Sequence, residues 1–582
     1  MSGVLLLVIA IICFIAAYFV YSKWLETKWG IDRNAKTPAY TYEDGVDYVP
    51  EPASVVFSHQ FSSITGAGPV TGPIIAAKFG WLPAFLWIVV GGIFFGAAHD
   101  FGAMYASVKN EGKSIGLIIE RYIGKTGKKL FLLFSWLFSL LVIAAFGDIV
   151  ANTFNGKTVG VAESVNTANA SAASISMIFI LTAMVLGILM KKFKLKGLAM
   201  HAVAIVLLLG TLALGIAFPI FTGKDTWLII VFVYLFLASV TPMWLLMAPR
   251  DFLSTYMLLG MIVTAVVGLL ISNPTMELNV FNGFAIENAA TGTVEYLFPI
   301  LFITIACGAV SGFHSLVSSG TSSKQIRNEK DMRPVSYGAM MAECVLAVAA
   351  LVVAGAVSKG GYLPEGTPFQ IFSSSVAGFL TKFGLPTNIA QAFMTMCISA
   401  LALTSLDSVA RIGRMALQEF FTEEKESQNP IAKALTNKYV ATVVTLICGY
   451  VLSKGGYNSV WPLFGSANQL LAALVMIAIA VFLKTTKRSG VMFYIPMYFM
   501  LAVTFTALSM SVYKSVIKLF GATSYTVLIP KEAVVGQFVV LSDGLQLFFA
   551  IALLALGVLV ATKCLMELHT KKEVKGTEEK VA

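Results

Sequence analysis

The segment Ser58–Pro73 reads SHQFSSITGAGPVTGP, and it limits how the chain can fold. It lies inside an apolar stretch, residues 54–79, that is long enough to cross a bilayer. Pro69 and Pro73 have no N–H to donate and their rings clash with carbonyl groups one turn earlier, so we expect no regular helix here. In hydrocarbon, the carbonyl groups that lose their helical partners must face protein, water, an ion or a substrate.

This irregular segment has two interpretations. Discontinuous helices in transporters point half-helix N-termini at anionic groups and bare carbonyls at cations. On that reading the segment is a substrate site, formed by Ser62, Ser63, Thr65, Gly66, Ala67, Gly68 and Pro69. The alternative is a close packing seam between helices, because Gly68 and Gly72 have GxxxG spacing.

Composition places the whole chain in a membrane. Of its 582 residues, 57% are hydrophobic and 12% are charged, against roughly 25% charged in soluble domains. The six cysteines are scattered singly and form no C-x-x-C pair, which argues against a metal or redox motif. The net charge of +10 does not require a nucleic-acid partner, because Lys and Arg collect in the cytoplasmic loops of membrane proteins.

The apolar segments predict an all-α, polytopic membrane bundle of about fifteen transmembrane helices. They lie at residues 4–22, 54–79, 83–107, 130–152, 174–190, 197–220, 227–247, 252–271, 297–319, 336–357, 387–407, 437–452, 461–483, 491–513 and 543–564. The first segment has no positive charge before it, which predicts an uncleaved anchor with its N-terminus outside.

The loop charges fit that orientation. Residues 272–296 carry no Lys or Arg, whereas the next loop carries Lys324, Arg327, Lys330 and Arg333. Since cytoplasmic loops are rich in Lys and Arg, we expect the second of these loops and the C-terminal tail to be cytoplasmic.

Ionisable and hydroxyl side chains gather toward the cytoplasmic ends of several predicted helices. Asp100 lies well inside the third segment, where an ionisable residue is a functional candidate. In segment 297–319, a helix would place Ser311, His314, Ser315 and Ser318 on one face. We predict that a coupling ion or proton binds among the polar residues His59, Asp100, His314, Ser315, Ser318, Ser319, Thr321 and Asp407. The alternatives are hydrogen bonds between helices, and an arginine partner for Asp100.

Two polar pairs are interpreted as structural. Asp407 and Arg411 stand at i and i+4, near enough to form a clamp at the inner mouth. Asn468 and Gln469 lie in a membrane helix and are expected to bond to neighbouring helices.

The segments also suggest an internal repeat. Two consecutive units of five spans have opposite orientations, and the second to sixth and seventh to eleventh segments could be such a pair. The seventh segment would then be interrupted like the second, at Thr241–Asp251, which holds two prolines; a plain proline kink is the alternative. This divides the chain into an N-terminal helix and cytoplasmic loop (1–53), a transporter core (54–436) and C-terminal helices with a short tail (437–582).

Several motifs together resemble the carbon starvation protein A family: His59–Pro69, His99–Phe101, Ser311–Gln325 and Trp461–Gly465. The resemblance covers about residues 50–485. It implies proton-driven uptake of peptides or pyruvate across the bacterial inner membrane. It also implies a fold of the leucine-transporter type, with one extra N-terminal and about four extra C-terminal helices. In that fold a cation lies between the first and eighth core helices, here the second and ninth segments.

We therefore expect a secondary active transporter that takes up a small organic nutrient by symport through alternating access, with no cofactor. The sequence leaves open pyruvate, another small carboxylate or a short peptide as substrate, proton or sodium as coupling ion, and the oligomeric state. A nutrient sensor or a channel is an alternative function. An intramembrane metalloenzyme is disfavoured, because the chain has no H-E-x-x-H and no histidine pair at i and i+4.

Overall fold

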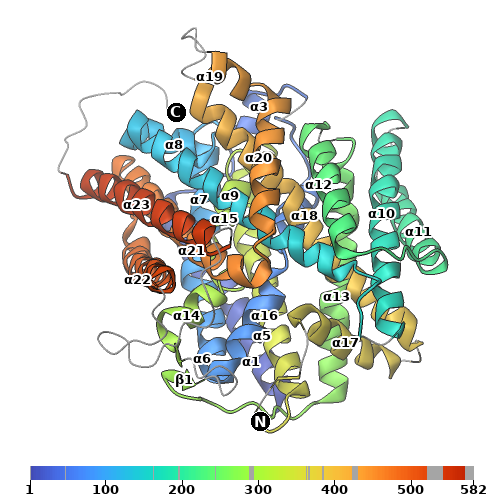
Figure 1. The fold of residues 1–582 in the computed structure, drawn as a ribbon. Helices are drawn as coiled ribbons and strands as arrows, with labels where there is room; N and C mark the ends of the chain where they lie inside the picture. The colour runs from blue at the N-terminus through green and yellow to red at the C-terminus, as the bar shows by residue number, and fades with distance from the viewer. Residues whose placement is uncertain are drawn as a thin grey trace.

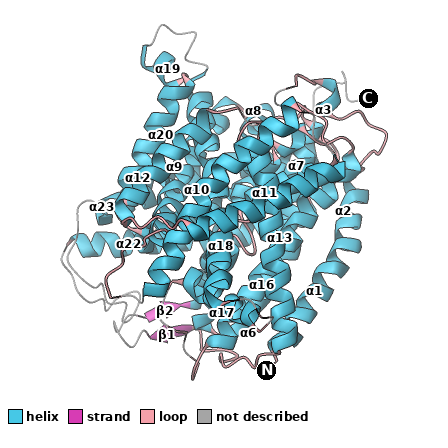
Figure 2. Ribbon diagram, turned by 90° about the vertical axis from the view of Figure 1, so that its right-hand side faces the viewer, coloured by secondary structure: helices cyan, strands magenta, loops and turns pink. Residues whose placement is uncertain are grey.

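The computed structural model describes residues 2–45, 48–160, 163–193, 197–242, 244–287, 294–361, 363–364, 367–382, 384, 386–422, 430–520 and 542–570. These residues form a helical bundle with one small two-stranded sheet (Figure 1, Figure 2). Eleven of the described helices are long and apolar enough to cross a membrane. A polytopic helical membrane bundle is thereby confirmed. The other four predicted segments contain shorter or interrupted helices.

The first half of the chain contains α1 (Gly3–Phe19), α2 (Tyr21–Trp29), α3 (Pro38–Thr41), α4 (Ala53–Ile64), α5 (Gly68–Ala76), α6 (Trp81–Leu86), a π-helical segment (Trp87–Gly96), α7 (Ala97–Lys109), α8 (Ile115–Ile123), α9 (Lys125–Thr153), α10 (Glu163–Lys192), α11 (Gly197–Ala217), α12 (Lys224–Val240) and α13 (Met247–Ser272). Strands β1 (Ala285–Glu287) and β2 (Val294–Tyr296) then pair antiparallel.

The second half contains α14 (Leu297–Thr304), α15 (Gly312–Ser318), a π-helical segment (Arg333–Gly338), α16 (Ala339–Val357), α17 (Pro368–Thr381), α18 (Thr387–Thr422), α19 (Pro430–Leu435), α20 (Lys438–Ser453), α21 (Tyr457–Thr485), α22 (Tyr494–Leu519) and α23 (Ser542–His569), with short 3-10 turns between some of them.

Burial separates central helices from peripheral ones. The apolar stretch of α21 is fully buried, and α9 and α18, which pack along each other, are buried over most of theirs. In α1 and α23 only about a third of the corresponding stretch is buried. A helix that exposes most of an apolar surface suits the outside of a membrane bundle.

The two ends of the bundle carry different elements. Helices α3, α8 and α19 lie at one end, and the start of α1, α17 and the β-hairpin lie at the other (Figure 2). Ser114 caps the N-terminus of α8, and Thr367 with Gln370 forms a capping box at the start of α17. The sequence analysis predicted neither of these short helices.

The interruption predicted in the seventh segment is wrong. Helix α12 is uninterrupted and ends at Val240, and α13 begins at Met247. Pro249 lies in the first turn of α13, where its missing N–H has no helical partner to lose. The second interruption lies instead in segment 297–319, for which a continuous helix was expected, between α14 and α15.

Candidate functional site

The first break in the bundle separates α4 from α5 at Thr65, Gly66 and Ala67. Pro69 lies in the first turn of α5, so the predicted interruption is confirmed there, whereas Pro73 lies inside α5 and does not interrupt it. All seven residues predicted to bind substrate, from Ser62 to Pro69, are buried. Among the described residues, the buried hydroxyl of Thr65 has no hydrogen-bond partner.

Two glycines of this segment allow another backbone to approach closely. A Cβ atom on Gly68 would collide with the Cys307 side chain, and one on Gly72 would lie 2.6 Å from the Thr304 carbonyl oxygen. Thr304 ends α14, and Cys307 lies between α14 and α15. The first break therefore lies directly against the second.

The second break, from Ile305 to Ser311, is held by two amides of α21. The Oδ1 atom of Asn468 accepts a hydrogen bond from the backbone N–H of Phe313 at 3.0 Å. The Nε2 atom of Gln469 donates to the Phe302 carbonyl at 2.6 Å. These side chains bond to backbone groups of the interrupted helix, as such groups require in hydrocarbon. The prediction that both amides bond to neighbouring helices is confirmed.

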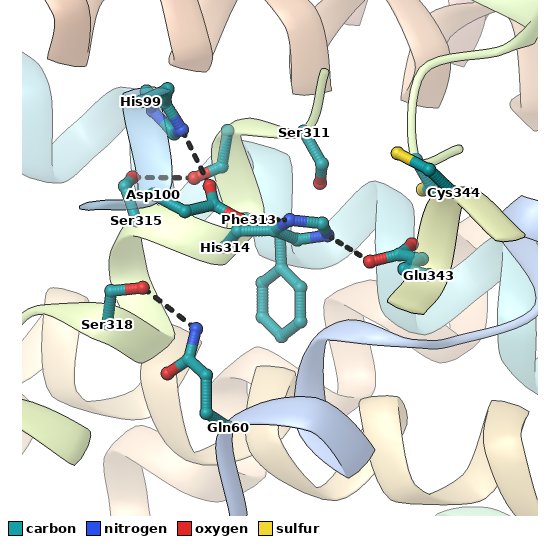
Figure 3. A network of polar contacts seen from close by, with 12 residues as sticks. Gln60, His99, Asp100, Ser311, Phe313, His314, Ser315, Ser318, Glu343 and Cys344 are labelled. Carbon is teal, nitrogen blue, oxygen red and sulfur yellow. Dashed lines mark hydrogen bonds and ion pairs between the residues drawn. The ribbon is translucent and has the colours of Figure 1, made fainter. Parts of the chain in front are cut away.

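Beside the second break lies a cluster of four fully buried side chains, His99 and Asp100 from α7, His314 from α15 and Glu343 from α16 (Figure 3). We call it the imidazole–carboxylate cluster. Asp100 Oδ1 lies 2.9 Å from His99 Nδ1, and Asp100 Oδ2 lies 2.9 Å from His314 Nδ1. On the other side of its ring, His314 Nε2 lies 3.4 Å from Glu343 Oε2. The His314 ring therefore stands between two carboxyl groups.

The structure brings together two residues of the predicted coupling site, Asp100 and His314. Asp100 contacts histidines rather than the loop arginine that was the alternative. The sequence analysis missed Glu343, although a signal was present. It is the one carboxylate within the predicted segment 336–357, and an ionisable residue at membrane depth is a functional candidate.

The serines of α15 have acceptors of their own. Ser315 donates to the Gly312 carbonyl and Ser319 to the Ser315 carbonyl, both at 2.6 Å. Ser318 accepts a hydrogen bond of 2.8 Å from Gln60 Nε2 on α4, so the two broken helices are also joined by side chains. The Ser318 contact matches the alternative in which hydroxyl groups form hydrogen bonds between helices.

Three other predicted coupling residues, His59, Thr321 and Ser319, do not join the imidazole–carboxylate cluster by any contact that the structure shows among its described residues. His59 and Thr321 line a cavity of about 360 Å³ between α4, α15 and α18. Its lining also includes Lys324, Arg411 and Arg414 but no carboxylate. His59 Nδ1 lies 2.7 Å from Asp251 Oδ2 on α13.

Asp407 belongs to a second buried cluster, with Arg250 of α13 and Tyr234 of α12, which we call the arginine cluster. Arg250 forms an ion pair with Asp407. The Tyr234 hydroxyl donates to Asp407 Oδ2 at 2.5 Å and accepts from Arg250 at 2.8 Å. Arg411, predicted to clamp Asp407, donates to the Thr241 carbonyl oxygen at 2.8 Å. The cationic partner of Asp407 is thus Arg250 from α13 and not Arg411 from the same helix.

The chain is similar in sequence to known proteins. The family model described as carbon starvation protein CstA matches residues 2–366 and 362–507. The chain is 30% identical over 522 residues to the peptide transporter CstA of Bacillus subtilis, covering 81% of this chain and 84% of that protein. It is 29% identical over 577 residues to the pyruvate/proton symporter BtsT of Escherichia coli, covering 84% and 78%. A solved structure of the manganese transporter of Eremococcus coleocola aligns with 90% of this chain and 98% of its own, with a TM-score of 0.46 and 13% identity.

Proposed function

Because the chain belongs to the carbon starvation protein CstA family, we propose that it takes up a short peptide or pyruvate by symport with protons. Membership of this family makes the chain a membrane transporter and not an enzyme. The relative named as a pyruvate/proton symporter favours protons over sodium as the coupling ion.

The observation that carries this proposal is the contact between two broken helices beside a buried set of titratable side chains. Bare backbone and the Thr65 hydroxyl at the first break offer ligands for a substrate. Asp100 and His314 offer groups whose charge changes when a proton binds. His314 lies on α15, which begins at the second break, and the predicted substrate segment (Ser62–Pro69) lies against that break. A proton on the His314 ring therefore acts on the helix next to the contact between the two breaks.

We also propose an inverted repeat, divided differently from the sequence prediction. Each unit holds a broken helix, a helix with a π-helical segment, a short helix and a long helix: α4/α5, α6–α7, α8 and α9 in the first, and α14/α15, α16, α17 and α18 in the second. Helices α8 and α17 lie at opposite ends of the bundle, as inversion requires (Figure 1).

The remaining helices extend this correspondence. Helix α13 packs along α4 as α21 packs along α15, and α12 packs on α9 as α20 packs on α18. Helices α10 and α11 pack on each other and form an insertion in the first unit. On this division the core covers residues 53–485 rather than 54–436.

For localisation, we propose the bacterial cytoplasmic membrane, with the N-terminus outside and the C-terminus in the cytoplasm. The loop without Lys or Arg, residues 272–296, contains β1 at the end of the bundle where α1 begins (Figure 2). Lys109 is the last residue of α7 and Lys113 lies between α7 and α8. Helix α8 lies at the opposite end of the bundle (Figure 2). This difference in loop charge supports the proposal that the end with α8 faces the cytoplasm.

Counterflow in proteoliposomes tests the transporter reading. Vesicles loaded with unlabelled substrate should transiently accumulate labelled substrate with no ion gradient imposed, which a channel or a sensor cannot do. An inward proton gradient, and not a sodium gradient, should then drive accumulation above the external concentration. Absence of counterflow for both pyruvate and short peptides would refute the proposal.

The substrate segment has its own test in Gly68→Ala. The added methyl group meets Cys307, so the two breaks must separate and substrate affinity should fall by about tenfold or more, a loss of about 1.4 kcal/mol. Gly260→Ala is the matched control, because a Cβ on this helical glycine meets no atom within 4 Å. Equal affinity in the two variants would remove the first break from the binding site.

A further inference from the structure

Glu343 is a buried carboxyl group that the sequence analysis did not single out. It lies on α16, its side chain is fully buried, and among the described residues neither of its oxygen atoms accepts a hydrogen bond. The nearest cationic partner is His314, 3.4 Å away. Its other polar neighbours are Asp100 and the thiols of Cys307 and Cys344.

The two carboxyl groups of the cluster have unequal surroundings. Asp100 faces ring nitrogens of His99 and His314 at 2.9 Å, an arrangement that suits a carboxylate anion. Glu343 has a single ring nitrogen at longer range, 3.4 Å, and its oxygen atoms accept no hydrogen bond among the described residues. A buried anion without hydrogen-bond donors is costly, so the neutral acid is the form that this environment favours for Glu343.

His314 is placed to move a proton between them. Its Nδ1 atom faces Asp100 and its Nε2 atom faces Glu343, on opposite sides of one ring (Figure 3). With the Nδ1 proton directed at Asp100, Nε2 carries the lone pair that faces the acid. Transfer breaks the O–H bond of Glu343 and forms an N–H bond at Nε2. Release of the Nδ1 proton then forms an O–H bond on Asp100 and leaves a neutral ring.

From this geometry we propose that Glu343 holds the coupling proton and that His314 relays it between Glu343 and Asp100. The inference rests on the proposed function, since it names the residue that carries the proton in the same transport cycle. The relay joins α16, α15 and α7, so one proton transfer changes the charge between three elements. Because α15 starts at the second break, this change in charge occurs next to the contact between the two broken helices.

The test is Glu343→Gln, which keeps the shape of the side chain but cannot carry a proton. In proteoliposomes the variant should lose proton-driven accumulation and internal acidification, while labelled substrate still exchanges in counterflow. Glu295→Gln is the matched control, because it removes a carboxyl group from β2, where Glu295 pairs with Lys78. Substrate-linked acidification by Glu343→Gln at the wild-type ratio would overturn the proposal.

A second measurement, on the wild-type protein, tests the proposal even if the Glu343→Gln variant fails to fold. Infrared difference spectra of the wild-type protein should show the carbonyl stretch of a protonated carboxyl group that shifts when substrate is added. Absence of this band in the wild type would overturn the proposal. Failure of wild-type counterflow would instead refute transport itself, so the two outcomes are distinguishable.

Discussion

The arginine cluster and the imidazole–carboxylate cluster are both buried, and they differ in whether their charge can change. In the arginine cluster, Arg250 pairs with Asp407, and a guanidinium group stays protonated at any physiological pH. In the imidazole–carboxylate cluster, His314 stands between Asp100 and Glu343, and imidazole exchanges protons near neutral pH. Burial of charge therefore does not by itself mark a coupling site. A cluster with arginine holds helices together, whereas one built on histidine can also respond to a proton gradient.

The largest expected effect comes from breaking the arginine cluster. Arg250→Met leaves Asp407 buried without its cation, which should lower the free energy of unfolding by about 3–5 kcal/mol. Thermal unfolding in detergent measures this loss. The double variant Arg250→Met/Asp407→Leu should recover most of the stability, because it buries no unpaired charge.

If Arg250→Met is as stable as the wild type, the arginine cluster does not hold its helices together, and the proposed difference between the two clusters is wrong. If the double variant regains stability and keeps normal proton coupling, the arginine cluster has a structural role and no role in transport.

Asp100→Asn should have the next largest effect, on coupling. The amide keeps the shape of Asp100 but cannot take the proton, so substrate uptake should no longer respond to a proton gradient. The hydrogen bonds to a charged group that are lost should cost about 1.5–3 kcal/mol of stability. A pH-sensitive dye inside proteoliposomes measures acidification during uptake.

The control for that variant is Asp225→Asn on α12, an exposed carboxylate paired with Lys454. It should leave acidification as in the wild type. If Asp100→Asn also acidifies the vesicle normally, Asp100 has no part in the cycle.

The smallest expected effect is that of His99→Gln. The glutamine amide can still donate toward the cluster, and His314 still contacts Asp100, so coupling should persist. The expected cost is about 0.5–1.5 kcal/mol of unfolding free energy, measured by thermal unfolding. Loss of coupling in this variant would show that His99 takes part in the relay, which would then include all four members of the cluster.

The sequence predicted one broken helix and not the other, for a physical reason. The first break carries its cause in the chain, because Pro69 cannot donate the backbone hydrogen bond that would continue α4 into α5. The second break, between Thr304 and Gly312, contains no proline. It is held by Asn468 and Gln469, which lie more than 150 residues further along the chain. Local sequence carries no sign of a partner that distant.

The partners of the charged residues show the same limit. Spacing at i and i+4 predicted Arg411 for Asp407, but the tertiary fold supplies Arg250 from α13. By contrast, the depth of Asp100 in its segment was enough to mark it, and the same argument would have marked Glu343. Burial depth can thus be predicted from an apolar pattern, whereas the identity of a contact across the bundle cannot.

The N-terminal part of α13 connects two neighbouring helices. Arg250 and Asp251 are consecutive, so their side chains leave the helix about 100° apart, and one reaches Asp407 on α18 while the other reaches His59 on α4. Because this part of α13 contacts both α18 and α4, it can move only together with both helices or after one of the two contacts breaks.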